Sequence, residues 1–585
     1  MTQSATLASP LSEGALPARP VRTYFPWILL AGWAAQVCVR LAFAAGHGAP
    51  IVNPDEAGYL IGARWLTGGP GTDLSGFTFY QGGYSLLLAP AYLVSSDPGV
   101  VYRLAIGINS LAGALIFPLG YLLLRRLGLS RLHGYTLGWA AALLPATTLF
   151  GVVAMADAVF PVLVLGWLLA LDRFVRRGGT GAVVTASLVA CFAHATHTRG
   201  TVIVALHCSV LVAYLVRGRA RRGPLVGLGV TAAGFVAATF LNDRLSHALY
   251  PYGTRDLGSN VLDRATSLSG QAWALSGGVG QLWAMIATTW GIGGLGLVVT
   301  ARVMCRPHAP REDRIMAGAL LAATASVAYL TSAALPDEHR VANFAYARYL
   351  SCFALVYTLI GLAALVRHRS PTREIAATFL VFCGAGLWVL GYAGPRLRTH
   401  LYLGWDFPEI GLLGGGGYDR LRLLVTSVVV CVLLLTFVLL RRWGVVKLFS
   451  ALLVLNLCAL TFIVVALTQQ TPPPPQPGVP AGRAALERPI PGVEHPPMDP
   501  VYPVPELIYA RVAYLVHWTR LERFDPGRGV RDPSLCAAIV FWPKGLRAAD
   551  TWPEHPPGWR FRPGGTPQKR SRWVTWYNPS CPAAR

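Results

Sequence analysis

Hydrophobic residues follow one another in long blocks along this chain, with short polar segments between the blocks. The blocks are about 17 to 24 residues long, which suits the hydrocarbon core of a bilayer, about 30 Å thick. They predict about 13 transmembrane helices, over residues 24–45, 100–124, 135–150, 156–171, 181–196, 200–216, 224–241, 281–301, 315–335, 347–366, 374–393, 422–440 and 446–468. The pattern therefore predicts an all-α polytopic membrane protein.

The loops between the blocks fall into two classes. Six are rich in arginine: 125–131, 173–177, 217–222, 302–314, 367–373 and 441–447. The positive-inside rule places these loops, and the N-terminus with them, in the cytoplasm. The longer and less basic loops are then expected outside: 46–99, 242–280, 336–346 and 394–421. Because the number of spans is odd, the C-terminus is also expected outside, which makes the protein a multi-pass protein of the plasma membrane.

Composition agrees with this class of protein. The chain is 54% hydrophobic and only 13% charged, whereas soluble domains carry about 25% charged residues. The net charge of +23 comes largely from arginines in the short loops. No basic helix with interleaved aromatic residues is present in the sequence, so we expect no nucleic-acid partner. High Ala, Gly, Arg and Pro content is typical of a bacterium with GC-rich DNA.

Changes in composition divide the chain into four parts. Residues 1–21 are predicted to be a disordered cytoplasmic leader, and residues 22–470 the transmembrane domain. Residues 471–505 are rich in proline and predict a stiff linker. Residues 506–585 are predicted to form a small extracytoplasmic domain.

The tail contains six tryptophans and two cysteines. The tryptophans either form the core of a small domain or stack on sugar rings, and both interpretations stay open. Cys536 and Cys581 are expected to form a disulfide if the fold brings them together, because the outer side of the membrane permits disulfides.

The chemistry of the chain is concentrated in a short acidic segment after the first hydrophobic block. Asn53 and Pro54 are good residues for a helix start, and Glu56 has the spacing of a capping box, so we expect a short amphipathic surface helix over 54–66. Acids favour helix N-termini, which explains one of Asp55 and Glu56 without a function. Alternatively, one carboxylate acts as a general base toward a hydroxyl, or the pair holds a divalent metal ion.

This arrangement resembles the GT-C glycosyltransferases, such as the protein O-mannosyltransferases and the aminoarabinose lipid A transferases. The resemblance lies in Pro54-Asp55-Glu56 within the first outer loop and in the order of the spans. It implies transfer of a sugar from a polyprenyl-phosphate donor to a glycan, lipid or protein acceptor outside the cytoplasm. Family members often have a second acid in the second outer loop. Asp157 stands there, where the relatives more often have Glu.

Candidate phosphate ligands lie at the outer ends of other helices. Arg348 lies between Tyr346 and Tyr349, where the relatives often have an Arg-Tyr pair, and its guanidinium is suited to bind a lipid phosphate through two hydrogen bonds. A simple interfacial anchor is the alternative. Arg64 and Arg199 are weaker phosphate candidates.

Together these residues predict an inverting membrane glycosyltransferase. Asp55 is the expected general base, Glu56 is expected to orient the acceptor or a metal, and Asp157 to support the site. Tyr59 is expected to line the donor or acceptor pocket, together with the two tyrosines beside Arg348. The rival functions are a transporter or lipid flippase, which should show internal repeats and ionisable residues at mid-membrane, and a glycan-binding surface scaffold.

Overall fold

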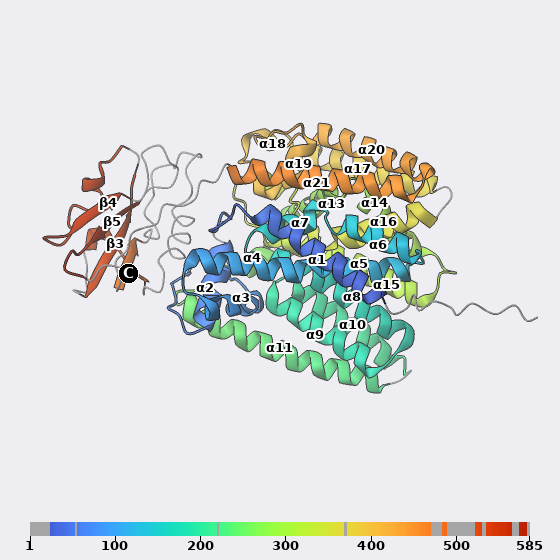
Figure 1. Ribbon diagram of the computed structural model, residues 1–585, viewed down its shortest axis with the longest axis horizontal. Coiled ribbons are helices and arrows are strands. Elements are labelled where there is room, and N and C mark those ends of the chain that lie inside the picture. The colour runs from blue at the N-terminus through green and yellow to red at the C-terminus, as the bar shows by residue number, and fades with distance from the viewer. Residues whose placement is uncertain are drawn as a thin grey trace, which may run out of the picture.

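The computed structural model describes residues 24–52, 55–218, 221–367, 371–469, 483–487, 521–528, 534–543, 545–563 and 573–581. Most of them form one large helical bundle, and a small β-sheet lies at one end of it (Figure 1). The structure is mostly helical, with several helices apolar enough to cross a membrane, which is consistent with the polytopic membrane class predicted from the hydrophobic blocks. The predicted leader, 1–21, lies outside the described residues.

The helices follow the hydrophobic blocks closely in the first half of the chain. They are α1 (Phe25–Ala44), α2 (Asp55–Leu66), α3 (Gly82–Val94), α4 (Pro98–Ala114), α5 (Ile116–Arg126), α6 (Arg131–Ala141), α7 (Pro145–Thr148), η1 (Leu149–Val152), η2 (Ala156–Ala158), α8 (Phe160–Arg177), α9 (Thr180–Thr196), α10 (Gly200–Val216) and α11 (Arg222–Leu249).

The second half continues in the same way. Its helices are α12 (Gly258–Thr266), α13 (Leu268–Thr288), α14 (Ile292–Cys305), α15 (Arg311–Ala334), η3 (Val341–Asn343), α16 (Ser351–Arg367), α17 (Thr372–Ala393), α18 (Arg396–Thr399), η4 (Gly404–Asp406), α19 (Pro408–Leu413), α20 (Leu423–Leu440), η5 (Arg441–Trp443) and α21 (Val445–Gln469).

Seven helices of the described chain are long and apolar enough to cross a membrane, or eight if one bent pair counts as a span. Five further apolar helices are shorter, including α9, α10 and α16. The total of 13 spans therefore stays a prediction, as does the orientation of the termini.

The loops predicted to share the cytoplasmic side do lie together. Asp172 at the end of α8 accepts hydrogen bonds from Arg126 (2.5 Å) and Arg176 (2.7 Å), which belong to two different basic loops. Arg176 also pairs with Asp313 from a third loop. These contacts show that the three loops share one end of the bundle.

The predicted outer loops meet at the other end. Arg255 binds Glu338 at 2.6 Å, and the backbone around Leu401 pairs with that of His339 and Val341. The less basic loops are thus clustered as the alternation of charge predicted.

Two predicted spans are broken. The block 135–150 is two helical segments bent by 72°, because Pro145 holds the preceding Leu144 in an extended conformation (ψ 126°). The predicted span 281–301 was wrong: α13 begins earlier, at Leu268, and ends before Trp290 and Gly291, whose φ angles of 56° and 80° stop the helix. The indole of Trp290 donates to Asn456 at 2.8 Å, which anchors this unusual conformation.

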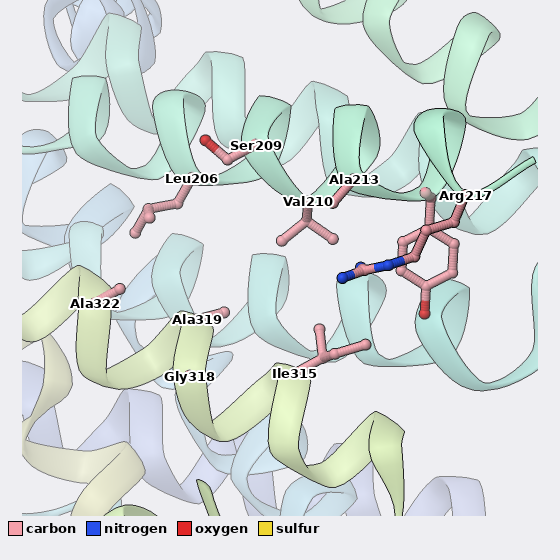
Figure 2. Close-up of a pocket in the computed structure, with 10 residues that line it drawn as sticks. Leu206, Ser209, Val210, Ala213, Arg217, Ile315, Gly318, Ala319 and Ala322 are labelled. Atoms are coloured by element: carbon pink, nitrogen blue, oxygen red, sulfur yellow. The ribbon is translucent and has the colours of Figure 1, made fainter.

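A mostly apolar groove of about 260 Å³ lies between α10 and α15 (Figure 2). Its walls include Leu206 and Val210 from one helix and Ile315 from the other, and Arg217 lies at one end. Arg217 is about 27 Å along α10 from Arg199, at 1.5 Å per residue. The groove therefore extends away from the end of α10 that carries the candidate site described below.

The C-terminal part contains a five-stranded sheet of order β2-β1-β3-β5-β4. Its strands are β1 (Arg483–Glu487), β2 (Leu521–Phe524), β3 (Leu535–Phe541), β4 (Arg560–Pro563) and β5 (Trp573–Tyr577). Strand β1 comes from the segment predicted as a linker, 471–505, so the predicted boundary between linker and C-terminal domain was wrong. The apolar run Ala484–Leu486 belongs to a strand that pairs with β2 on one side and β3 on the other.

The small C-terminal fold also buries three of the tail's six tryptophans. Trp552, Trp573 and Trp576 are at most 2% exposed, so they form the core of the small fold, while Trp518 lies outside the described residues. A disulfide bond joins Cys536 in β3 to Cys581.

Candidate active site

Four charged side chains from four distant segments form one continuous cluster at the outer-loop end of the bundle. Asp55 begins α2, Asp157 lies in η2, Arg199 precedes α10 and Arg348 precedes α16. Asp55 and Arg348 are 293 residues apart in the sequence. We call these four residues the Asp–Arg cluster.

Arg348 is the centre of the Asp–Arg cluster. Its Nη1 donates to Oδ2 of Asp55 at 2.7 Å and its Nε donates to Oδ2 of Asp157 at 3.0 Å, while Nη2 forms an ion pair with the same Asp157 oxygen at 2.9 Å. Asp157 Oδ1 accepts a further bond from Arg199. The order is therefore Asp55, Arg348, Asp157, Arg199, and two positive charges balance two negative ones.

The Asp–Arg cluster is closed at one end and open at the other. The side chains of Asp157 and Arg199 are 1% exposed, that of Arg348 14% and that of Asp55 24%. Burial disfavours the ionised form of Asp157, but the charges of Arg348 and Arg199 outweigh it and hold the pKa of this carboxyl well below its ordinary value. An incoming molecule would meet Asp55 and Arg348 first.

Aromatic side chains enclose the cluster. The Tyr80 hydroxyl donates to Oδ1 of Asp55 at 3.2 Å, and the ring of Tyr59 packs edge-on against Tyr80. Tyr346 and Tyr349 flank Arg348 in the sequence. Their rings pack edge to face, with centroids 4.4 Å apart. All three tyrosines predicted to line the pocket are thus near the charged groups.

Further aromatic rings support the two guanidinium groups. Phe150 lies 5.7 Å from the guanidinium of Arg348, and Phe160 lies 4.9 Å from that of Arg199. Positive charge over an aromatic face is favourable where water is excluded.

Two predicted site residues serve other purposes. Glu56 is fully buried and accepts four hydrogen bonds: from the backbone N–H of Ile51 (2.7 Å), Val52 (2.6 Å) and Ala154 (2.7 Å), and from the Tyr102 hydroxyl (2.6 Å). Both of its oxygens are occupied, so Glu56 fixes the chain around α2 and does not face the cluster.

Arg64 is likewise structural. Its guanidinium donates to the Pro70 carbonyl at 3.0 Å and to the Thr72 hydroxyl at 3.1 Å, which ties the loop after α2 to the helix. Its side chain is buried, and none of these partners belongs to the Asp–Arg cluster. The phosphate candidacy of Arg64 is therefore not supported by its position.

Helix α2 is present as predicted but is not a surface helix. Residues 56–64 are all buried. A Cβ at Gly58 would lie 2.0 Å from the ring of Tyr80, and one at Gly62 would lie 2.6 Å from Ser85, so glycines let α2 pack closely against α3. The predicted caps, Asn53 and Pro54, lie outside the described residues.

The metal hypothesis finds no matching geometry. Within the part of the chain that the structure describes, no group of three or more His, Cys, Asp and Glu side chains has metal-binding proximity. Arg348 bridges Asp55 and Asp157, and the third predicted ligand, Glu56, is held elsewhere by its four donors.

The sequence interpretation missed two buried acids in the outer loop 394–421. Burial raises the pKa of Asp406 to about 6, although nearby Arg340 and Arg348 lower it in part. Burial likewise raises the pKa of Glu409 to about 7. The signal available in the sequence was an acid between aromatic residues, Trp405-Asp406-Phe407, in an otherwise apolar stretch.

No family model and no curated protein sequence matches this chain. Solved structures do match it. ArnT from Cupriavidus metallidurans in the apo state is 16% identical, with 95% of this chain and 98% of that chain covered and a TM-score of 0.52. The same protein bound to undecaprenyl phosphate is 15% identical, with 96% and 100% covered and a TM-score of 0.51. The arabinosyltransferase EmbB from Mycobacterium smegmatis, 15% identical, is more distant: 79% of this chain and 42% of that chain are covered, with a TM-score of 0.37.

The similarity to ArnT defines the class of fold. The chain shares the fold of this protein, and the fold expected from the resemblance in its sequence is confirmed. The similarity to ArnT extends over nearly the full length of both chains, including the small C-terminal part.

Proposed function

We propose that this protein is an integral-membrane glycosyltransferase that moves a sugar from a polyprenyl-phosphate donor to an acceptor hydroxyl outside the cytoplasm. The observation that carries the proposal is the Asp–Arg cluster, in which a partly exposed carboxylate and a guanidinium lie 2.7 Å apart. It lies in a fold shared with ArnT, for which a complex with undecaprenyl phosphate is known. The acceptor is a glycan, lipid or protein.

Arg348 is the proposed ligand of the donor phosphate. A guanidinium binds a phosphate through two parallel hydrogen bonds, and it stabilises the charge that grows on the phosphate as it leaves. Arg348 Nη1 donates to Asp55 at 2.7 Å in the structure. A donor phosphate would replace Asp55 as the partner of this nitrogen, and the freed carboxylate would then be available to the acceptor.

Asp55 is the proposed general base. The acceptor oxygen attacks the anomeric carbon, the bond from that carbon to the phosphate oxygen breaks, and the acceptor proton passes to the carboxylate of Asp55. Polyprenyl phosphate leaves with the bonding electrons. Because the attack is a single displacement from the opposite face, the product has inverted anomeric configuration.

The remaining charged residues position these two. Asp157 holds Arg348 through two nitrogens and Arg199 through one, so it fixes where the guanidinium of Arg348 points. Arg199 also donates to the Tyr349 carbonyl at 2.9 Å, which anchors the segment that carries Arg348. Glu56 keeps α2, and with it Asp55, at a constant place in the bundle.

The test is sugar transfer by the purified full-length protein in liposomes, with radiolabelled polyprenyl-phosphate sugars and with Asp55→Asn beside wild type. The substitution should lower kcat by about 100-fold or more, the usual contribution of a general base. Asp243→Asn is the matched control, because Asp243 is 62% exposed near the end of α11 and outside the cluster.

The outcomes separate the rival functions. Transfer that persists in Asp55→Asn removes this residue from the base role. Binding of polyprenyl lipids without transfer from any donor would favour a flippase.

A further inference from the structure

A second polar group near the Asp–Arg cluster has no partner within the described chain. Asp406 in η4 is 7% exposed, its Oδ2 is buried without a hydrogen bond there, and no other described residue donates to its side chain. Leaving a buried polar group unsatisfied costs about 1–3 kcal/mol, and more for a charged one. Folded proteins retain such groups mainly where a ligand or water supplies the missing bond.

A second unsatisfied group lies four residues away. The hydroxyl of Tyr402 is buried and also lacks a partner among the described residues, while its ring stacks on Phe407 at 5.2 Å between centroids. Burial raises the pKa of the Tyr402 hydroxyl, with smaller contributions from Tyr418, Asp406 and Asp419. The loop thus offers one hydroxyl donor and one carboxylate acceptor.

This loop is fixed relative to Arg348. The backbone N–H of Leu401 donates to the His339 carbonyl at 2.8 Å, and that of Val341 donates to the Leu401 carbonyl at 3.0 Å. The segment joined in this way leads directly into Arg348. Arg340 and Arg348 also lie within electrostatic range of Asp406, and both lower its pKa against the larger effect of burial.

The chemistry fits a sugar. Sugar hydroxyls donate hydrogen bonds, and the two carboxylate oxygens of Asp406 offer several lone pairs to accept them. The Tyr402 hydroxyl can donate to a ring or hydroxyl oxygen. We propose that Tyr402 and Asp406 form the subsite that binds the hydroxyl groups of the donor sugar, beside the phosphate held by Arg348. This inference rests on the proposed function and extends it to the recognition of the donor.

The experiment measures the contribution of the sugar to the binding affinity separately from that of the lipid carrier. Affinities of the full-length protein in phosphatidylethanolamine–phosphatidylglycerol nanodiscs are measured for undecaprenyl phosphate alone and for undecaprenyl phosphate carrying mannose, glucose, arabinofuranose or 4-amino-4-deoxyarabinose. In wild type, at least one sugar should raise the affinity above that of the carrier. In Asp406→Asn the gain in affinity due to the sugar should fall by about 10- to 100-fold, which corresponds to the loss of a hydrogen bond to a charged group.

The controls keep the result interpretable. Tyr402→Phe removes only a hydroxyl, so it should fold and should lose a smaller part of the same gain in affinity. Asp419→Asn changes a 61% exposed acid of the same loop and should change nothing. Asp406→Asn and Tyr402→Phe should both bind undecaprenyl phosphate alone as wild type does.

Two results would overturn the subsite. One is an unchanged gain in affinity due to the sugar in both Asp406→Asn and Tyr402→Phe, and the other is an equal loss of affinity for the carrier alone. Failure of the proposed function looks different, because wild type would then transfer no sugar from any donor in the liposome assay, whether or not it binds the lipids.

Discussion

The two aspartates of the Asp–Arg cluster should differ sharply in what they do for stability. In Asp157→Asn, Arg348 keeps Asp55 as its partner, whereas Arg199 loses its one anionic partner and keeps neutral ones: backbone carbonyls, the His197 ring nitrogen and aromatic rings. The substitution therefore strands one cation whose side chain is 1% exposed. Breaking a buried ion pair in this way costs about 3–5 kcal/mol of unfolding free energy.

Asp55→Asn provides the matched comparison. Here Arg348 retains both of its bonds to Asp157, and the lost partner is 24% exposed. A partly exposed pair contributes about 0–1 kcal/mol, so the stability of this variant should remain near that of wild type. Its catalytic defect should nevertheless be large.

Equilibrium unfolding of the purified protein in mixed detergent–SDS micelles, followed by circular dichroism, measures both variants. The double variant Asp157→Asn/Arg199→Gln should recover part of the loss, because it removes the stranded cation. The reasoning fails if Asp157→Asn unfolds within about 1 kcal/mol of wild type, or if Asp55→Asn is equally destabilised.

Three further predictions follow from individual contacts. Arg348→Lys should weaken binding of undecaprenyl phosphate about tenfold or more, because an ammonium lacks the planar fork, whereas Arg64→Lys should leave that affinity unchanged and lower only the melting temperature. Glu409 has a pKa raised by burial to about 7, so the folded state takes up a proton as pH falls from about 7 to 4.5, and stability should decline as pH rises through that window. Glu409→Gln should flatten this decline in melting curves recorded between pH 4.5 and 8, and an unchanged slope would contradict the assignment. Replacing Cys536 and Cys581 by alanine should destabilise the C-terminal sheet by up to about 4 kcal/mol, the loop-closure value for a 45-residue separation, and limited proteolysis should then cleave the sheet region first.

Much of the fold was readable from the hydrophobic blocks, and the errors have local causes. The bend before Pro145 follows from a general restriction on the residue before proline. In contrast, the break between α13 and α14 depends on a left-handed tryptophan held by Asn456, 166 residues away, and no local pattern reports such a contact.

The candidate site shows the same division. Asp55, Asp157, Arg199 and Arg348 were each recognisable as charges at helix ends, but their order within the cluster depends on contacts between segments up to 293 residues apart. Glu56 lies apart from the cluster because neighbouring residues of a helix point about 100° apart, and its carboxylate is held by Ile51, Val52, Ala154 and Tyr102.

Loop chemistry was the hardest part to predict. Asp406 lies in a segment without hydrophobic periodicity, and its burial comes from the packing of surrounding loops. No spacing rule distinguishes such an acid from an exposed one such as Asp419.

The position of β1 between β2 and β3 in the C-terminal sheet has a consequence for biogenesis. Residues 483–487 leave the ribosome about 50 residues before their partner β3, and β5 follows later still. Since this interior strand must wait for partners distant in sequence, the sheet can assemble only after β3 and β5 have been synthesised. Closure of the Cys536–Cys581 bond, which requires an oxidising compartment, would then follow the synthesis of all five strands.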